Sequence, residues 1–389
     1  MSVLDDAPVP AYGEASLADL TPSLLAALGV PGEANTLDLP AVRRACLVLV
    51  DGLGWEQLRD NRDVAPYLVG MAERRLGSAV DPVHGGRVLT AGFPATTATS
   101  MGSLGTGLTP AEHGLLGLRV SVPGTDRLMN CLHWDTGVDP VSWQPRPTVF
   151  ERAEAAGVAA SHHAPGSFRE GGLTKAALRG SRYVAADSPG ELVATAGEAL
   201  RASDRALTCV YHADLDATGH RKGCRSAAWR FQLSHVDRLV EQLAGVLPPD
   251  AALYVTADHG MVDIDPGDRV DADSVPELRE GVSLLGGEAR ARHIYTRSGA
   301  ADDVLATWRG LLGERMWIAS RAEAVASGWF GPEVPDGMLE RIGDVVAAAR
   351  DGVAVIASKA EPAESALVGQ HGSMTPAEQL VPLLDYTAG

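Results

Sequence analysis

Acidic and imidazole side chains recur in four short segments of the sequence, in each case close to a glycine. Carboxylate oxygens and imidazole nitrogens are the ligands that zinc prefers in proteins, and manganese and iron accept the same donors. A lone Asp-Gly after a strand is more often a turn than a ligand, and Asp-His-Gly or His-Gly alone is a weak signal, but all four segments together are hard to obtain by chance. The candidate ligands are Asp51, Asp216, His220, Asp258, His259 and His371.

The spacing of these residues indicates how they could surround metal ions. Asp216 and His220 lie four positions apart, so one helical turn or a tight loop can point both side chains inward. Asp258 and His259 are neighbours and would point to different sides of an extended chain. One such pair could therefore serve both sides of a site for two metal ions.

A stretch rich in hydroxyl groups, residues 92–114, lies between the first two of these segments and contains no Lys or Arg. Its residues 98–106 are compatible with a helix that Gly107 and Pro110 would end. A hydroxyl at a helix start faces free backbone N–H groups and the positive end of the helix dipole. That position suits a nucleophilic oxygen held against a phosphoryl group, although a capping threonine is the simpler interpretation of an isolated case.

The elements expected around these segments must bring them to one place. Residues 46–50, 206–211 and 251–256 are apolar runs of strand length that lead directly into the acidic segments. The intervening segments carry helical periodicity, most clearly residues 225–247. This alternation predicts an α/β fold with a mainly parallel central sheet flanked by helices, which places the acids where such sheets bind ligands.

The pattern changes along the chain in a way that predicts three parts. Residues 1–40 are expected to be an N-terminal lead-in, and residues 41–263 together with 351–389 the α/β core. Residues 264–350 carry many charges and are expected to form an inserted cap.

Composition restricts the class of protein. The chain has 389 residues and a formal net charge of −17, and nothing in that balance indicates a nucleic-acid groove or binding to an acidic membrane. We expect neither a signal peptide nor a membrane helix, because the first residues lack a basic region and no apolar run is long enough. Four scattered cysteines without CxxC spacing favour a cytoplasmic protein with no structural disulfide.

Taken together, the chain resembles the nucleotide pyrophosphatase/phosphodiesterase branch of the alkaline phosphatase superfamily, over most of residues 45–265 and over 370–385. The segments LDATGH and TADHGM carry the resemblance most specifically. The resemblance implies an alkaline phosphatase-like fold and two metal ions, for which we expect zinc, with manganese as the alternative. One ion would be held by Asp51, Thr97, Asp258 and His259, and the other by Asp216, His220 and His371.

The hydroxyl-rich stretch departs from the family pattern. Family members place the nucleophilic threonine directly before Phe-Pro, whereas Phe93-Pro94 precedes the threonines here. Counting back nine residues from Thr106-Gly107 gives Thr97 as the nucleophile, and Thr96 stays open as the alternative. No asparagine follows nearby to hold the phosphate as in the family, so the backbone N–H of Ala98 is the candidate donor.

The resemblance implies two-metal hydrolysis of a phosphodiester or phosphoanhydride, as in nucleotide pyrophosphatases, through a covalent phospho-threonine that water then releases. The substrate would be a small phosphorylated molecule, with a nucleotide as one candidate. Hydrolysis of phosphomonoesters or of a phosphonate C–P bond is the alternative on the same site, and a non-catalytic binding protein is the alternative of another class. Natural substrate, metal identity and oligomeric state stay open.

Overall fold

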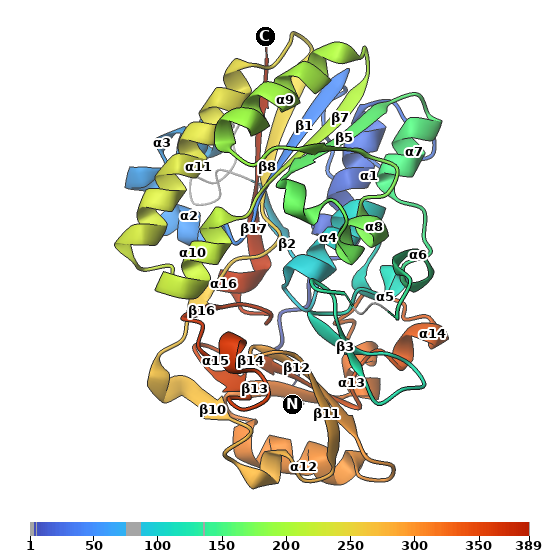
Figure 1. The fold of residues 1–389 in the computed structure, drawn as a ribbon, viewed down its shortest axis with the longest axis vertical. Coiled ribbons are helices and arrows are strands. Elements are labelled where there is room, and N and C mark those ends of the chain that lie inside the picture. Colours follow the sequence, from blue (N-terminus) through green and yellow to red (C-terminus); the bar gives the residue numbers. More distant parts are fainter. Residues whose placement is uncertain (1–3, 5, 75–86, 135–136, 389) are drawn as a thin grey trace.

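The computed structural model describes residues 4, 6–74, 87–134 and 137–388, and its centre is a seven-stranded sheet (Figure 1). From one edge to the other its strands are β2 (Arg87–Thr90), β17 (Leu380–Thr387), β8 (Ala251–Thr256), β1 (Arg44–Val50), β7 (Ala206–His212), β5 (Ala159–Ala164) and β6 (Arg182–Ala185). Strands β6, β5, β7, β1 and β8 are parallel, and β17 is antiparallel to β8 and β2. The expected mainly parallel α/β sheet is confirmed.

Helices cover both faces of this sheet (Figure 1). On one face α9 (Pro189–Ala202) contacts β7 and β5, and α11 (Ala227–Gly245) contacts β8 and α9. On the other face α1 (Leu17–Ala27), α4 (Thr97–Thr106) and α7 (Val149–Ala155) contact one another. The apolar side chains that recur every three or four residues along α11 are all buried, as the periodicity predicts; they are Trp229, Leu233, Val236, Val240 and Leu243.

The remaining helices are short. They are α2 (Trp55–Asp60), α3 (Pro66–Arg74), α5 (Pro110–His113), α6 (Pro140–Trp143), α8 (Gly172–Ala177), α10 (Asp214–Lys222), α12 (Ala301–Leu312), α13 (Arg321–Ala326), α14 (Asp336–Leu339), α15 (Pro362–Ser365) and α16 (Pro376–Gln379). Two small antiparallel pairs join β3 (Arg119–Ser121) to β4 (Leu128–Asn130) and β9 (Val262–Asp263) to β16 (Gly369–Gln370).

A second, antiparallel sheet occupies the stretch expected to be a cap and lies below the central sheet in Figure 1. Its four strands are, in order, β11 (Val282–Glu288), β12 (Ala291–Thr296), β14 (Val345–Ala349) and β13 (Met316–Ser320). Helix α12 packs on it around the buried Trp308. Beside it, β10 (Arg269–Asp271) pairs with β15 (Ala354–Ile356). The exact limits of the cap stay a prediction.

Two buried ion pairs fasten the second sheet to the segment that follows it. Arg290 Nε lies 2.9 Å from Glu378 Oε1, and both side chains are fully buried. Arg292, on β12, lies 2.9 Å from Glu361 Oε2. Because a buried charge without its partner is strongly destabilising, these pairs fix the position of the β11–β12 turn against the core.

The N-terminal segment is part of the packed structure. Leu17, Leu20, Leu24 and Leu25 of α1 are fully buried in the main hydrophobic core. Residues 1–3 and 5 of the expected lead-in, and residue 389 of the expected core, lie outside the described residues. Within the described part of the chain, no helix has both the length and the apolar composition of a membrane span.

Candidate active site

The first candidate metal group lies at the carboxyl ends of two neighbouring parallel strands. Asp51 follows β1, and Asp258 and His259 follow β8; all three are buried. His259 Nε2 lies 3.5 Å from Asp51 Oδ1 and 3.5 Å from Asp258 Oδ2. Both strands end at the same edge of the sheet, so the two acids converge as the sequence predicts.

Thr97 is the first residue of α4 and joins this group. Its Oγ1 lies 3.2 Å from His259 Nε2, and Ser100 one turn later donates to the backbone oxygen of Asp258 at 2.6 Å. Thr96 occupies the N-cap position but makes no capping bond, and its side chain is buried. Of the two candidate nucleophiles, the structure places Thr97 against the candidate metal ligands.

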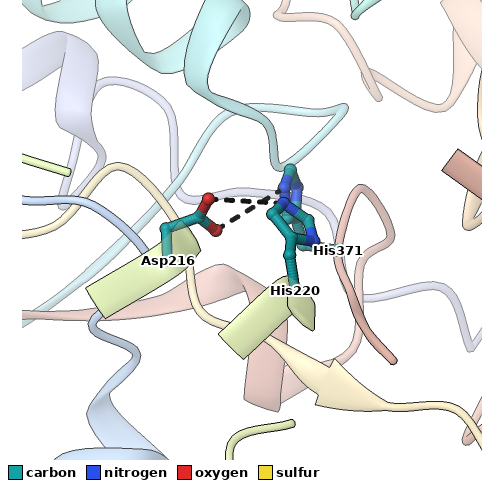
Figure 2. A group of neighbouring side chains, drawn as sticks. All are labelled: Asp216, His220 and His371. Carbon is teal, nitrogen blue, oxygen red and sulfur yellow. Dashed lines mark ion pairs between the residues drawn. The ribbon is translucent and has the colours of Figure 1, made fainter. Parts of the chain in front are cut away.

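The second candidate group combines α10 with the segment after β16 (Figure 2). Asp216 and His220 lie one turn apart on α10, with His220 Nε2 3.3 Å from Asp216 Oδ2. His371 Nε2 lies 4.0 Å from Asp216 Oδ1. The four-residue spacing thus turns Asp216 and His220 to one side of a helix, and the late histidine meets them from the other end of the chain.

Backbone carbonyls orient all three histidines in the same way. The Nδ1 atoms of His220, His259 and His371 lie 2.7 Å, 3.0 Å and 2.9 Å from the carbonyl oxygens of Gly369, Gly260 and Ala95 respectively. An Nδ1–H donor of this kind fixes the tautomer and leaves Nε2 as the free lone pair. Each imidazole is therefore prepared to offer Nε2 to a cation.

The carboxylate oxygens that lack a hydrogen bond are suited to bind divalent cations. Buried oxygens of three carboxylates, Asp51 Oδ1, Asp216 Oδ1 and Asp258 Oδ2, have no hydrogen-bond donor. The two groups adjoin, since the rings of His259 and His371 stack with centroids 3.6 Å apart. Two clusters of carboxylate and imidazole donors are the ligand sets that zinc or manganese would take.

The pKa shifts of the candidate ligands also favour bound cations. Burial, followed by repulsion from Asp258 and Asp216, raises the pKa of Asp51 well above its usual range. Burial and the neighbouring His259 and His220 hold the pKa of His371 well below its usual value, so this ring stays neutral. Bound cations would compensate the crowded carboxylates and coordinate the neutral imidazole.

A cavity of about 680 Å³ opens over both groups. Part of its lining, called here the apolar wall, consists of apolar side chains: Met101, Leu118, Leu132, Phe168, Leu173 and Leu178. Another part, called here the polar wall, includes Arg119, Asn130, Glu288, Glu361, Glu364 and Gln370. The site therefore has room for an organic group beside the phosphoryl position.

Several other polar side chains lie in or near the cavity. Tyr211 lines the cavity and donates to Asp51 Oδ2. His162 also lines it, and His163 and His212 are buried. His113 is buried and structural, with its ring nitrogens at Ser103 Oγ and the Leu115 N–H.

Three residues of the cavity were not predicted from the sequence: Arg119, Asn130 and Glu288. Arg119 and Asn130 face each other across the β3–β4 pair, and Glu288 ends β11. None stands beside a recognisable motif, and the strands that present them lack the long apolar runs of the central sheet. Their proximity to the site depends on how the second sheet packs against the core. In the sequence, only a periodic pattern of side chains along β11 could have indicated that packing.

Comparisons with known proteins agree with this geometry. The chain matches a family model described as type I phosphodiesterase / nucleotide pyrophosphatase over residues 45–374. No curated protein sequence gives a significant match. Murine ectonucleotide pyrophosphatase / phosphodiesterase 5 has a similar structure, with a TM-score of 0.69 and 20% identity, covering 88% of each chain. An inactive threonine-to-alanine form of that murine protein, in complex with AMP, gives a TM-score of 0.68 and 19% identity, covering 89% of this chain and 88% of that one.

A second kind of relative is phosphonoacetate hydrolase from Sinorhizobium meliloti 1021, solved with phosphonoacetate, with a TM-score of 0.65 and 18% identity over 89% of this chain and 90% of that one. Structural likeness at such identity shows the fold alone. The family model, however, spans most of the chain and every candidate ligand from Asp51 to His371. The chain therefore belongs to the type I phosphodiesterase / nucleotide pyrophosphatase family.

Proposed function

We propose that this protein hydrolyses phosphodiester or phosphoanhydride bonds with two divalent metal ions, zinc or manganese, and Thr97 as the nucleophile. One observation carries the proposal: the Thr97 hydroxyl, two groups of buried carboxylate and imidazole donors, and a cavity for an organic substituent all meet at one place. A non-catalytic binding protein has no need for such a nucleophile beside its ligand groups.

The residues of the site would have separate roles in metal binding and in nucleophilic attack. Asp51, Asp258 and His259 would hold one ion beside Thr97, and the second group would hold the other. When bound, the ions would neutralise phosphoryl oxygens and favour the ionised hydroxyl. Thr97 Oγ1 then forms a bond to phosphorus as the bond to the leaving oxygen breaks, and water later cleaves the phospho-threonine.

The cavity contains hydrogen-bond donors for a phosphoryl oxygen that does not contact the metal ions. The N–H of Ala98 belongs to the first turn of α4, where backbone donors are free of helical partners. Asn130 lines the same cavity, and its Oδ1 already accepts from the N–H groups of Leu132 and His133 at 2.9 Å and 3.1 Å. Its amide nitrogen is therefore a second candidate donor to phosphate.

The charges in the cavity favour diesters over monoesters. Arg119 lines the cavity, but its guanidinium already pairs with Glu361 at 2.6 Å and with Glu364. A dianionic monoester would meet those carboxylates without a cation released to hold it, whereas a diester or anhydride brings less charge to the reacting phosphorus. A nucleotide substrate is compatible with the apolar wall, since AMP is the ligand in the murine relative.

A substrate panel tests the proposal. The protein would be stripped with chelator, reloaded with zinc or manganese, and assayed on an aryl phosphomonoester, an aryl phosphodiester, a dinucleotide and phosphonoacetate. We expect diester or anhydride cleavage to exceed the other activities, and none without metal. A clear preference for the monoester would move the protein to the phosphatases, and phosphonoacetate cleavage alone would identify a C–P hydrolase. No turnover of any substrate with both ions bound would favour the binding protein.

A further inference from the structure

Glu288 brings a carboxylate from the second sheet into the cavity, and neither candidate metal group includes it. It is the last residue of β11, at the turn into β12, and only 7% of it is exposed. Its neighbours Gly287 and Ala289 line the cavity with it. The turn thus forms part of the polar wall, with Glu288 Oε2 3.7 Å from His371 Nδ1.

The turn that carries Glu288 is held in place on both sides. The Ala289 carbonyl accepts from the Val355 N–H, and the Arg290 carbonyl from the Ala349 N–H, each at 2.8 Å. The Arg290 side chain pairs with Glu378 in the core. A side chain mounted on such a turn has little freedom to withdraw from the cavity.

The two oxygens of Glu288 have different surroundings. Oε2 lies 3.7 Å from His371 Nδ1. Oε1 is buried and has no hydrogen-bond donor in the protein. A buried acceptor without a donor is unfavourable, so its persistence at a cavity wall indicates a partner that the protein itself does not supply.

That partner is not one of the proposed metal ions. His371 directs Nε2 toward Asp216, whereas Glu288 faces the opposite ring nitrogen, Nδ1. Glu288 therefore lies behind the ring as seen from the second metal group. The other carboxylates of the same wall, Glu361 and Glu364, are engaged by Arg119.

We propose that Glu288 Oε1 accepts a hydrogen bond from a hydroxyl or ammonium group on the organic part of the substrate. Glu288 is then a specificity-determining residue, and the substrate class narrows to phosphodiesters or anhydrides with a donor close to the phosphoryl group. The inference rests on the proposed function, because it requires a phosphorylated substrate in this cavity. It adds that an ester of the same size without a donor is a poor substrate.

The test compares 4-nitrophenyl phosphodiesters that differ only in their second ester group: ethyl, 2-hydroxyethyl, 2-aminoethyl and 2-(trimethylammonio)ethyl. Release of 4-nitrophenol by the metal-loaded protein gives kcat and KM, with ³¹P NMR separating hydrolysis from spontaneous cyclisation of the hydroxyethyl ester. We expect the hydroxyethyl or aminoethyl ester to exceed the ethyl ester in kcat/KM by about tenfold to a hundredfold, because the ethyl ester leaves the buried acceptor without a partner.

Two variants assign that preference to Glu288. Glu288→Ala should reduce the preference to less than about threefold while the ethyl ester is still cleaved, since the acceptor alone is lost. Glu288→Gln keeps the side-chain size and one weaker acceptor, so it should retain part of the preference and serves if the alanine variant does not fold. Glu364→Gln is the matched control, because its carboxylate is engaged by Arg119, and it should keep the wild-type ratio.

Each other outcome overturns the inference. Equal kcat/KM for the ethyl and donor-bearing esters would refute it while leaving phosphodiesterase activity intact. A trimethylammonio ester as good as the aminoethyl ester would show a charge effect without a hydrogen bond. Equal losses on all esters in Glu288→Ala, or loss of bound metal, would assign Glu288 a structural role. Absence of diester hydrolysis by the wild type would instead refute the proposed function.

Discussion

Replacing Thr97 by alanine should abolish turnover with little effect on folding. The side chain is half-buried, and its hydroxyl makes one contact of hydrogen-bond length, to His259 Nε2 at 3.2 Å. Losing one such bond costs about 0.5–1.5 kcal/mol of stability, which is a shift of a few degrees at most in a chain of this size.

The effect on catalysis should be far larger. If Thr97 is the attacking oxygen, its removal should lower kcat by about three orders of magnitude or more, equivalent to about 4 kcal/mol in the barrier. Asp51, Asp258 and His259 remain to hold the adjacent ion, so metal content should stay near that of the wild type. The assay is diester hydrolysis, with metal content and thermal unfolding measured on the same preparations.

Thr96→Ala is the matched control, since it removes the neighbouring hydroxyl at the N-cap of α4. We expect its kcat within about tenfold of the wild type. Thr97→Ser, which keeps a hydroxyl, should retain partial activity. Full loss in Thr96→Ala with activity kept in Thr97→Ala would move the nucleophile by one residue, and activity in both alanine variants would mean that water attacks directly.

Three further predictions test the site and the fold. Elemental analysis should find close to two metal ions per chain, and chelation should remove activity; full activity without metal would end the two-metal proposal. Gly372→Ala should reduce occupancy toward one ion, because Gly372 has φ +130° and an added Cβ would lie 2.8 Å from Glu288 Cγ, displacing the His371 segment, whereas Gly190→Ala, in open space, should keep both ions. Burial lowers the pKa of His113 to about 3, so its contribution to stability is complete above pH 6.5 and is lost as pH falls from 6.5 toward 3. His113→Gln should therefore remove up to about 1.4 kcal/mol per pH unit from the acid-induced decline seen in chemical unfolding, whereas the same change at the exposed His133 should leave the slope unaltered.

The sequence was most informative where a strong local pattern coincided with the chemistry. Apolar runs ending in Asp51 and Asp258 predict parallel strands whose carboxyl ends meet, because burial on both faces leaves little choice of structure. Asp216 and His220 were predictable from spacing, since a helix converts four positions into one face. The two groups of candidate ligands therefore lie together as expected.

The second sheet was largely missed, for a physical reason. Residues 293–297 predict a strand, which is β12, whereas β11, β13 and β14 are antiparallel and stabilised by contacts distant in sequence. The hydroxyl-rich stretch contains no arginine, yet Arg119 reaches the cavity from β3. Glu288 ends β11 and Asn130 ends β4, so their positions depend on packing that no local pattern encodes.

The position of β17 has a consequence for how the protein is made. Strand β8 lies between β1, from early in the chain, and β17, from near its end, and His371 also belongs to that late segment. While the ribosome is still adding residues after β8, one side of this buried strand has no partner, and an unpaired apolar edge is a template for aggregation. Neither the sheet nor the second metal group can be completed until residues 371–387 have emerged from the ribosomal tunnel, so we expect the core to close after synthesis rather than during it.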